Sequence, residues 1–462
     1  MISLINPNAT VEVAKKLGII TPPLGLGYLA SVLRANGFKV QIVDNLVERL
    51  SFDGLIKRIK NSQIVGITST TPTFNSALRY AKVIKGKLSN VFVILGGVHA
   101  TFMPYEAMKH GYVDAVCVGE GEQTIVEVAE RVEEGKSLEG VRGLIYRDGL
   151  TVVENEKRGF IEDLDSLPFP AYDLMPLDKY TVLGRKLEQF PMITSRGCPF
   201  GCRYCSSSLF LGRKFRARSA KNVVDEMEWL NEKFGAKHIA FGDDTFTFNK
   251  KRVFEICDEI MRRGLDVEWS CSSRVDTINY ELLKKMREAG CVAIYYGVES
   301  ANQETLSKYY RKRIKLEKVK KALNLTKKAG ITTICSFIIG APFETKEDIK
   351  NTLKFAIKLN PDYAQFSILT PYPGTEIYEE AKSKNLILTE NFEEYTAGKP
   401  ILKNDYMTPK EISKLLKYCY LRFYLRPGFI WNEIKNKRIR VIFDVVRRAF
   451  GGEKCSKSSV ES

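Results

Sequence analysis

Short apolar runs alternate with amphipathic segments along the first third of the chain. Strand-like runs occupy residues 2–6, 38–43, 64–67, 91–95 and 114–118, and an amphipathic helix is expected at 24–36. The fourth run ends on Gly96 and Gly97, and the fifth ends on Gly119. Repeated strand–helix units of this kind predict an α/β fold with a doubly wound, Rossmann-like parallel sheet. Ligands bind such sheets beyond the carboxyl ends of the strands, where these glycines fall.

A second series of apolar runs follows between about residues 190 and 375. Its six expected strands are 192–195, 238–241, 268–272, 293–298, 332–339 and 363–369, with helical segments between them. This spacing predicts a partial (β/α)6 barrel, whose working face is again at the carboxyl ends of the strands. A proline-rich, turn-like stretch at 164–173 separates the two series.

The pattern therefore predicts four parts. Residues 1–150 form the doubly wound domain, 151–185 a linker, 186–400 the barrel, and 401–462 a basic helical region. A chain of 462 residues is too long for one typical core, which agrees with more than one domain.

Composition narrows the class of protein. A hydrophobic content of 44% and a charged content of 27% describe a soluble globular chain, and no apolar run is long enough to cross a bilayer. The formal net charge of +16 permits nucleic acid, an anionic membrane surface or acidic substrates as partners. A lysine-rich, solvated surface explains most of this charge without any of them.

Three cysteines close together carry the strongest chemical signal. Cys198, Cys202 and Cys205 form a Cx3CxxC pattern within one short loop. Three thiolates can hold three irons of a [4Fe-4S] cluster, whereas the usual cubane takes four cysteines. The fourth iron is then open to a substrate or a cofactor. Tyr204 lies within the same run, and an aromatic ring can cover an adenine face.

Other uses of cysteine fit less well. A zinc site needs a fourth Cys or His at pair spacing, and the chain has no second CxxC. Ten scattered cysteines without a signal peptide do not suggest a disulfide framework. Other cysteines, such as Cys117 and Cys257, lie in apolar runs that suit the core. Functional thiols and no targeting segment predict a reducing, cytoplasmic location.

The run Cys198-Pro-Phe-Gly-Cys202-Arg-Tyr-Cys205 resembles the signature of the radical S-adenosylmethionine (SAM) enzymes. The resemblance implies that the amino and carboxylate groups of SAM chelate the open iron. It also implies that an electron from the cluster cleaves SAM to methionine and a 5′-deoxyadenosyl radical, which abstracts hydrogen from an unactivated carbon. An external electron donor of the flavodoxin or ferredoxin type is then required.

Motifs at later strand ends resemble the SAM contacts of that family. Asp243 and Asp244 occupy the position of the Gly-Gly-Glu motif, where a carboxylate can accept a charge-assisted bond from the SAM ammonium. The alternative is that they cap the next helix. Glu299 and Ser300 resemble the residues that contact the ribose.

Two further sites complete this series. Gly340 and Pro342 lie in a Gly-x-Pro-x-Glu-Thr turn that resembles the one passing close to adenine. Arg274 either pairs with the SAM carboxylate or belongs to a structural ion pair. The order of the motifs at successive strand ends is more specific than any single motif.

The first domain resembles cobalamin-binding domains. Aligning Gly25 with the glycine of their DxHxxG loop places Pro22 where the lower-axial histidine would stand, so that histidine is absent. The second and third elements of the pattern do match, and they consist of Thr68, Ser69, Gly96 and Gly97. The alternative is a cofactor-free sheet that only shapes the active site.

The cobalamin-binding radical SAM subfamily often lacks that histidine. Its members resemble this chain at residues 96–101 and 119–122, which adds His99, Gly119 and Glu120 to the expected cobalamin contacts. His99 is the obvious spare ligand for the cofactor, or it contacts the cofactor periphery or only packs. With [4Fe-4S], SAM and cobalamin, the resemblance implies three cofactors.

The C-terminal region combines aromatic and basic residues. Aromatic residues between 418 and 431 precede Lys435, Lys437, Arg438 and Arg440. This composition suits peripheral contact with the inner face of a membrane, and it equally suits an ordinary domain-covering helix. The resemblance of this region to family members that act on hopanoids, archaeal lipids and tetrapyrroles favours a hydrophobic substrate.

The expected function is a cobalamin-dependent radical SAM methyltransferase acting on an unactivated carbon of a small molecule; no catalytic side chain is assigned. The first alternative is radical cyclisation or carbon–carbon coupling without methyl transfer. The second is RNA modification, but no RNA module with stacking aromatics is evident, so no nucleic-acid partner is expected. The third is a non-catalytic corrinoid or iron–sulfur carrier.

Overall fold

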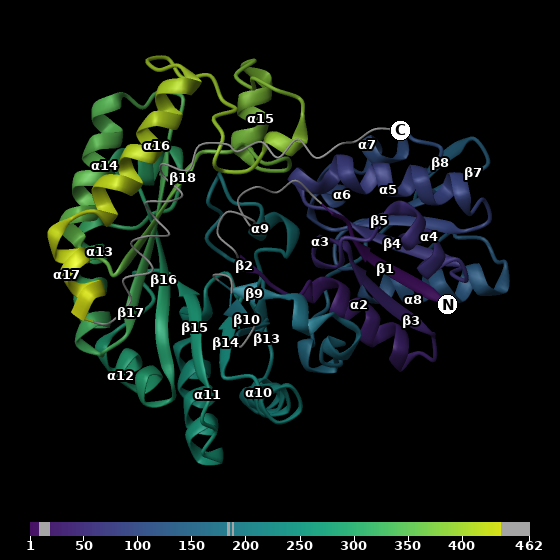
Figure 1. The fold of residues 1–462 in the computed structure, drawn as a ribbon, viewed down its shortest axis with the longest axis horizontal. Helices are drawn as coiled ribbons and strands as arrows, with labels where there is room; N and C mark the ends of the chain where they lie inside the picture. The colour runs from purple at the N-terminus through teal and green to yellow at the C-terminus, as the bar shows by residue number, and fades with distance from the viewer. Residues whose placement is uncertain (9–18, 183–184, 187–188, 436–462) are drawn as a thin grey trace.

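The computed structural model of the chain describes residues 1–8, 19–182, 185–186 and 189–435. Two large β-sheets, each built mainly of parallel strands, lie side by side (Figure 1). The N-terminal sheet and its helices, purple to blue, occupy the right of the view. The barrel sheet and its helices, teal to green, occupy the left, and the C-terminal helices α16 (Pro409–Tyr424) and α17 (Pro427–Lys435), in yellow, lie on its outer side.

The N-terminal sheet has seven strands in the order β3-β1-β4-β5-β6-β7-β8. The five parallel strands are β1 (Ile2–Asn6), β3 (Val40–Asp44), β4 (Ile64–Thr68), β5 (Phe92–Gly96) and β6 (Ala115–Cys117). The antiparallel hairpin of β7 (Leu144–Asp148) and β8 (Thr151–Glu154) extends one edge. The winding direction reverses between β1 and β4, so the ligand crevice of this topology lies beyond the carboxyl ends of these two strands.

Helices cover both faces of this sheet, which confirms the doubly wound arrangement. One face carries α2 (Leu24–Ala35) and α8 (Glu122–Glu134). The other carries α4 (Phe52–Ile59), α5 (Phe74–Lys87), α6 (Val98–Phe102) and α7 (Pro104–Met108). Along β1, Leu4 enters the first core and Ile5 the second, so the strand is apolar at consecutive positions. The core beneath α2 and α8 is continuous with the barrel core.

The second sheet is parallel throughout and follows chain order. Its strands are β11 (Gln189–Met192), β14 (His238–Phe241), β15 (Glu268–Ser273), β16 (Cys291–Glu299), β17 (Thr332–Ile339) and β18 (Tyr363–Ile368). Its helices are α10 (Ala220–Phe234), α11 (Lys250–Arg263), α12 (Tyr280–Glu288), α13 (Leu316–Lys328) and α14 (Lys346–Leu359). Since β11 and β18 are sheet edges, the barrel is partial, as expected.

The first barrel strand differs from its prediction. The sequence places it at 192–195, but β11 ends at Met192, and β12 (Ser195–Arg196) pairs antiparallel with β13 (Arg216–Ala217). The cause is the buried carboxylate of Asp243. It accepts hydrogen bonds from the backbone N–H of Thr194 at 2.7 Å and from the hydroxyls of Thr194 and Ser195 at 2.5 Å each. These bonds turn the chain out of the sheet just before the three clustered cysteines.

The segment expected to be a linker is packed into the molecule. It contains the 3-10 turns η2 (Leu164–Ser166), η3 (Tyr172–Leu174) and η4 (Leu177–Lys179). Tyr172 and Tyr180 are fully buried, and the Tyr180 hydroxyl donates to the Asp44 carboxylate at 2.7 Å. The remaining short elements are β2 (Ile19–Ile20), β9 (Thr181–Val182), β10 (Arg185–Lys186), α3 (Asn45–Glu48), α9 (Ser207–Phe210), α15 (Glu376–Ser383), η1 (Thr71–Thr73), η5 (Phe246–Phe248), η6 (Thr305–Tyr309) and η7 (Phe392–Glu394).

The start of the C-terminal region is a domain-covering helix. The hydroxyls of Tyr420 and Tyr424 on α16 donate to the carbonyls of Phe366 and Ala364 on the edge strand β18, at 2.9 and 2.7 Å. On α17 the Trp431 side chain is 71% exposed. The predicted basic residues Lys437, Arg438 and Arg440 lie outside the described residues. Within the described part of the chain, no helix is long and apolar enough to cross a membrane.

Candidate active site

The three clustered cysteines lie in the loop between β12 and α9. The backbone N–H of Cys198 donates to the Gly212 carbonyl at 3.0 Å, and that of Cys205 to the Cys202 carbonyl at 3.1 Å. All three thiols are unbridged and partly exposed, whereas the other described cysteines are buried. Burial raises the pKa of the Cys205 thiol to about 11, so a bound cation is needed to hold it as a thiolate near neutral pH.

This donor set fits three irons of a [4Fe-4S] cluster. Among the described residues, no three His, Cys, Asp or Glu side chains are grouped so that they could hold a single metal ion. Three soft sulfur ligands presented by one loop are the ligands that iron–sulfur clusters take in proteins.

Gly197 sets the path of this loop. Its φ is +91°, and a Cβ at this position would lie 2.1 Å from the Lys214 carbonyl oxygen. We expect Gly197→Ala to displace the loop and to lower the iron bound after anaerobic reconstitution to less than about half of wild type. Gly201→Ala is the matched control, because Gly201 also has a positive φ but its nearest neighbour is an Arg213 side-chain atom at 3.6 Å. Equal iron contents in wild type and Gly197→Ala would contradict the prediction.

Glu299 is joined to the cysteine loop by hydrogen bonds. Its Oε1 accepts from the Tyr204 hydroxyl at 3.1 Å and from Lys312 Nζ at 2.8 Å. Its Oε2 accepts from the Ser336 hydroxyl at 3.3 Å. Glu299 has a φ of +69°, an uncommon conformation for glutamate that clusters at functional sites. A Cβ on Gly297 would lie 2.3 Å from Glu299 Oε1, so the carboxylate occupies space that only glycine leaves free.

The two neighbouring aspartates have different surroundings. The Asp243 carboxylate accepts three hydrogen bonds in the turn at Thr194 and Ser195, so it has a structural role. Asp244 Oδ2 is buried without a hydrogen-bond partner, and the Asp244 charge contributes to raising the pKa values of Cys198 and Cys205. A buried carboxylate oxygen with no donor, close to the thiols, fits the ammonium group of SAM.

Arg274 supports the ion-pair alternative. Its guanidinium makes two hydrogen bonds to the Asp276 carboxylate, at 2.9 and 2.8 Å, and lies 3.7 Å from the centre of the Phe200 ring. Because Phe200 is part of the cysteine loop, Arg274 helps to hold that loop in place. Ser300 is likewise used locally, since its hydroxyl accepts from the Asn302 N–H at 3.1 Å.

The turn at Gly340 and Pro342 is held by its own glutamate. The buried Glu344 carboxylate accepts from the Ala341 N–H at 2.9 Å, and burial raises the pKa of this carboxyl to about 7. Gly340 has a φ of +82°. The turn therefore has a fixed shape at the carboxyl end of β17.

At the carboxyl ends of β4 and β5, two loops approach closely. Gly97 has a φ of +93°, and a Cβ there would lie 2.6 Å from the Ser69 carbonyl oxygen and 2.9 Å from Thr68 Oγ1. Ser69 donates from its hydroxyl to the Gly96 carbonyl at 3.1 Å. The close packing of these two loops is thus sufficient to explain why Thr68, Ser69, Gly96 and Gly97 are small residues. Gly25 and Gly119, by contrast, have open space where a Cβ would stand, which leaves room for a ligand.

His99 is completely buried between the rings of Phe74 and Phe392, with ring centres 4.1 and 4.5 Å away. Its Nδ1 lies 3.2 Å from the Thr71 hydroxyl, and its Nε2 has no hydrogen-bond partner. The unpartnered nitrogen is compatible with the expected contact to a cofactor, although Phe392 covers the ring.

The buried His99 predicts a pH dependence of stability. Desolvation lowers its pKa from 6.5 to about 4, so between these values the unfolded chain binds more protons than the folded chain. The stabilisation is complete above about pH 6.5 and is lost as the pH falls towards 4. We expect the free energy of unfolding to fall by roughly 2 kcal/mol from about pH 7 to pH 5, measured with denaturant. In His99→Gln this component of the slope should vanish; an unchanged slope would contradict the prediction.

Glu120 joins the loop after β6 to the β12–β13 hairpin. Its carboxylate accepts from Arg216 Nη1 and Nη2 at 3.0 and 2.9 Å and from Arg196 Nη1 at 3.1 Å. Arg196 Nη2 also donates to Glu122 at 2.6 Å. We name these four side chains the bridging ion-pair network; all four are at most 8% exposed. The sequence predicts a cobalamin contact for Glu120, but these bonds already use its carboxylate.

Several members of the site were missed by sequence reasoning. Arg196 stands two residues before Cys198, and this proximity was the only available signal for the network. Lys312 lies in a run of basic residues that reads as a solvated surface, yet it is only 7% exposed. Gly297 gave no signal, because its role depends on where Glu299 and Lys312 lie in space.

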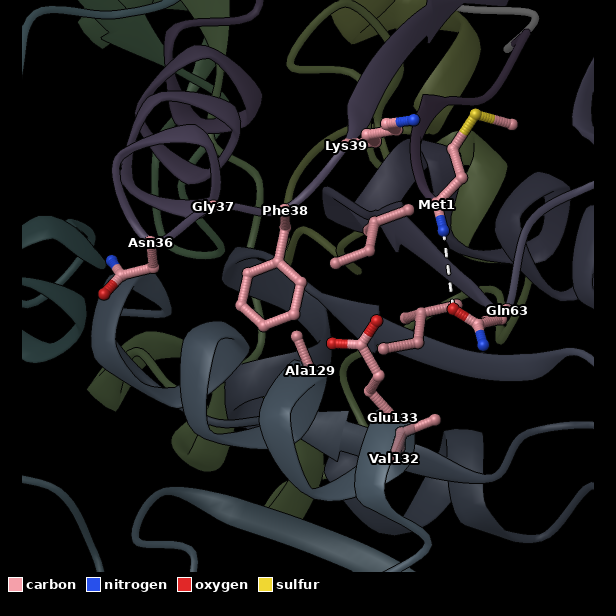
Figure 2. Close-up of a pocket in the computed structure, with 11 residues that line it drawn as sticks. Met1, Asn36, Gly37, Phe38, Lys39, Gln63, Ala129, Val132 and Glu133 are labelled. Carbon is pink, nitrogen blue, oxygen red and sulfur yellow. Dashed lines mark hydrogen bonds between the residues drawn. The ribbon is translucent and has the colours of Figure 1, made fainter.

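A small cavity of about 270 Å³ lies away from this site (Figure 2). It is lined by residues such as Met1, Phe38, Gln63 and Glu133, at the amino ends of β1 and β4. The cysteines and the glycine loops lie at the carboxyl ends of their strands. The cavity therefore has no part in the candidate site.

Comparison with known proteins agrees with this geometry. Residues 192–356 match the radical SAM superfamily, and residues 12–129 match the B12 binding domain. An uncharacterized methyltransferase of Pyrococcus horikoshii is 43% identical over 94% of this chain and 94% of its own length. The anaerobic magnesium-protoporphyrin IX monomethyl ester cyclase of Rubrivivax gelatinosus is 33% identical over 88% of this chain and 75% of its own length.

Solved structures share the fold. The cobalamin-dependent S-adenosylmethionine radical enzyme OxsB, with aqua-cobalamin and SAM bound, superposes with a TM-score of 0.75 at 19% identity, covering 96% of this chain and 71% of its own. The radical SAM methyltransferase TsrM of Kitasatospora setae gives 0.69 at 20% identity, covering 83% and 74%. With its two matched domains and these relatives, the chain belongs to the cobalamin-binding radical SAM enzymes, whose cofactors are a [4Fe-4S] cluster, SAM and cobalamin.

Proposed function

We propose that this enzyme is a methyltransferase that adds a methyl group to an unactivated carbon of a small hydrophobic molecule, of lipid or tetrapyrrole type. The observation that carries the proposal is the bridging ion-pair network, which attaches the cysteine loop directly to the strand-end loop at Gly119 to Glu122 in the B12-binding domain. Radical generation and methyl donation then occur next to each other. The similarity to a protein named as a methyltransferase supports it further.

When bound, the cluster, SAM and cobalamin supply a 5′-deoxyadenosyl radical and a transferable methyl group. The chain's own residues bind and orient these groups. Cys198, Cys202 and Cys205 would ligate three irons. The Asp244 carboxylate would accept a hydrogen bond from the ammonium group of SAM. Glu299, with its charge balanced by Lys312, accepts from the ribose hydroxyls.

The remaining residues shape the two cofactor sites. The turn at Gly340 and Pro342 would contact the adenine of SAM, and Tyr204 would contact the nucleoside from the cysteine loop. On the other sheet, the cobalamin contacts proposed are Gly25, Thr68, Ser69, Gly96, Gly97, His99 and Gly119. Asp243, Arg274 and Glu120 act as positioning residues, because their charged groups are engaged within the protein. The Ser300 hydroxyl only accepts, from the Asn302 N–H, so it would donate its own hydrogen to the ribose.

A radical cyclase is the second candidate, and the similarity to magnesium-protoporphyrin cyclases favours it. The two functions predict different products. Methylation adds one methylene to the mass of the substrate, whereas cyclisation removes two hydrogens. The mass difference between substrate and product therefore decides between them.

The test is anaerobic reconstitution with iron, sulfide, hydroxocobalamin and SAM, with extracts from a strain lacking the gene as the source of substrate. We expect formation of 5′-deoxyadenosine together with a metabolite heavier by one methylene, detected by mass spectrometry. Reconstituted protein that binds SAM but never yields 5′-deoxyadenosine would contradict the proposal.

The proposal extends to partners and location. An external one-electron donor of flavodoxin or ferredoxin type reduces the enzyme in the cytoplasm, and no nucleic acid takes part. The C-terminal region makes peripheral contact with the inner face of the membrane, which the exposed Trp431 and Ile434 on α17 support. Sedimentation with anionic vesicles, compared for wild type and Trp431→Ser, measures this contact.

A further inference from the structure

The segment from residue 308 to 321 is unusually rich in positive charge. It contains eight lysines and arginines and a single acidic residue, Glu317. Lys312 is buried, and the other seven basic residues are exposed; they are Lys308, Arg311, Arg313, Lys315, Lys318, Lys320 and Lys321. We refer to residues 308–321 as the basic segment.

The basic segment packs directly on the cysteine loop. The backbone N–H of Arg203 donates to the Tyr310 carbonyl at 3.1 Å, and its side chain donates to the Tyr309 carbonyl at 3.3 Å. The rings of Tyr204 and Tyr310 are 5.2 Å apart. Because Arg203 and Tyr204 lie between Cys202 and Cys205, the basic segment is in direct contact with the part of the chain proposed to carry the iron–sulfur cluster.

Three consecutive cations of the basic segment point in different directions: Lys312 points into the protein, and Arg311 and Arg313 lie on the surface. Lys312 Nζ reaches inward to Glu299 at 2.8 Å and to the Tyr204 hydroxyl at 3.2 Å. Its neighbours Arg311 and Arg313 are exposed and have φ values of +48° and +55°. Arginine rarely adopts this conformation, so tertiary contacts hold the loop in a shape that presents both guanidinium groups to solvent.

Most of this charge is not neutralised by acidic groups in the described part of the chain. Lys308 pairs with Glu304, and Arg311 pairs with Glu376. In the described part of the molecule, none of the other five exposed cations has an acidic oxygen within 4 Å. A hollow of about 640 Å³, lined by Gln303, Ser307 and residues 313–317, opens beside Arg313 and Lys315.

We infer that the basic segment docks an acidic one-electron carrier protein, of flavodoxin or ferredoxin type, that reduces the cluster. The inference rests on the proposed function, in which the cluster must receive an electron before each cleavage of SAM. One electron passes from the reduced carrier to the oxidised cluster, so the carrier is oxidised and the cluster is reduced by one electron each, and no bond forms or breaks. Unneutralised positive charge steers an acidic carrier to this face. Docking there would bring the redox centre of the carrier close to the cysteine loop.

A nucleic-acid partner fits this surface less well. Single-stranded nucleic acids are bound by cations interleaved with exposed aromatic rings on which bases stack. Here Tyr310 is fully buried, and Tyr309 is partly buried against Phe343, with ring centres 4.7 Å apart. Neither tyrosine of the basic segment is exposed, so the segment itself offers charge without exposed rings on which bases could stack.

The test compares two double charge reversals. Arg313→Glu with Lys315→Glu changes the basic segment. Lys57→Glu with Lys60→Glu makes the same change in charge at the carboxyl end of α4, in the N-terminal domain. Cluster reduction in the reconstituted, cobalamin-loaded enzyme is followed by rapid-mixing absorbance, with a reduced flavodoxin or with the methyl viologen radical cation as reductant. We expect the flavodoxin rate to fall at least about tenfold at low ionic strength in the first variant only, and the difference to shrink as salt is added.

The viologen rate separates docking from damage to the cluster. We expect it to be unchanged or faster in the Arg313→Glu, Lys315→Glu variant, since that reductant is a small cation. Equal flavodoxin rates in all three proteins would overturn the inference, as would a fall with both reductants. Loss of tRNA retention at low salt with an unchanged flavodoxin rate would assign the surface to nucleic acid and also overturn it. The proposed function is tested separately, by measuring SAM cleavage in wild-type enzyme reduced with the viologen, which needs no carrier protein. Absence of cleavage there would contradict the proposed function and not the docking surface.

Discussion

Replacing Cys202 by alanine is expected to eliminate SAM cleavage and to leave a folded protein that cannot retain its cluster. In the proposed site each of the three thiolates would hold one iron, and among the described residues no other cysteine is exposed to replace one of them. We expect iron after reconstitution to fall from about four per chain to less than one, and 5′-deoxyadenosine to fall to background. Iron analysis and chromatography of the reaction products measure the two effects.

The matched control is Cys335→Ala. Cys335 is completely buried in the barrel core on β17, so its loss costs about 1 kcal/mol of stability and leaves the cysteine loop untouched. The control should keep its iron and its 5′-deoxyadenosine formation. Retention of a four-iron cluster by Cys202→Ala, or equal loss in the control, would show that the three-cysteine assignment is incorrect.

The strands of the N-terminal sheet were predictable because they are buried on both faces and apolar at consecutive positions. The barrel strands alternate between buried and half-buried positions instead, and runs such as 332–339 were recognised because they are apolar or small at nearly every position and flanked by helical segments. The exception is instructive. Residues 192–195 read as a strand, but the Asp243 carboxylate captures the polar groups of Thr194 and Ser195, and this long-range contact overrides the local pattern.

Strand ends could also be predicted, which is why the cysteine loop and the glycine loops fall where they were expected. What each polar side chain does at those ends could not be read from spacing. Asp243 and Asp244 are adjacent in sequence, yet the first is saturated with hydrogen bonds and the second has an unpartnered oxygen. Similarly, Glu120 finds Arg216, 96 residues further along the chain, only after the two sheets have packed together.

Replacing Glu120 by glutamine should have the largest effect on stability of any single change at the interface. Burial alone would raise the pKa of Glu120, but hydrogen bonding to Arg216 and the charge of Arg196 lower it, so the group is ionised at neutral pH. Glutamine keeps the shape but leaves two buried guanidinium groups with one fewer charge to balance them. We expect the free energy of unfolding to fall by about 3–5 kcal/mol, measured by denaturant titration.

A positioning role predicts more than lost stability. Arg196 lies two residues before Cys198, so weakening its ion pair with Glu120 should alter the distance between the reduced cluster and cob(II)alamin. Pulsed electron paramagnetic resonance can measure this distance in the folded fraction. Glu127→Gln is the control, because its ion pair with Arg158 is 39% exposed on the glutamate side and contributes at most about 1 kcal/mol. If Glu120→Gln destabilises the protein no more than this control and leaves the measured distance distribution unchanged, the network neither holds the two parts together nor sets the spacing of their cofactors.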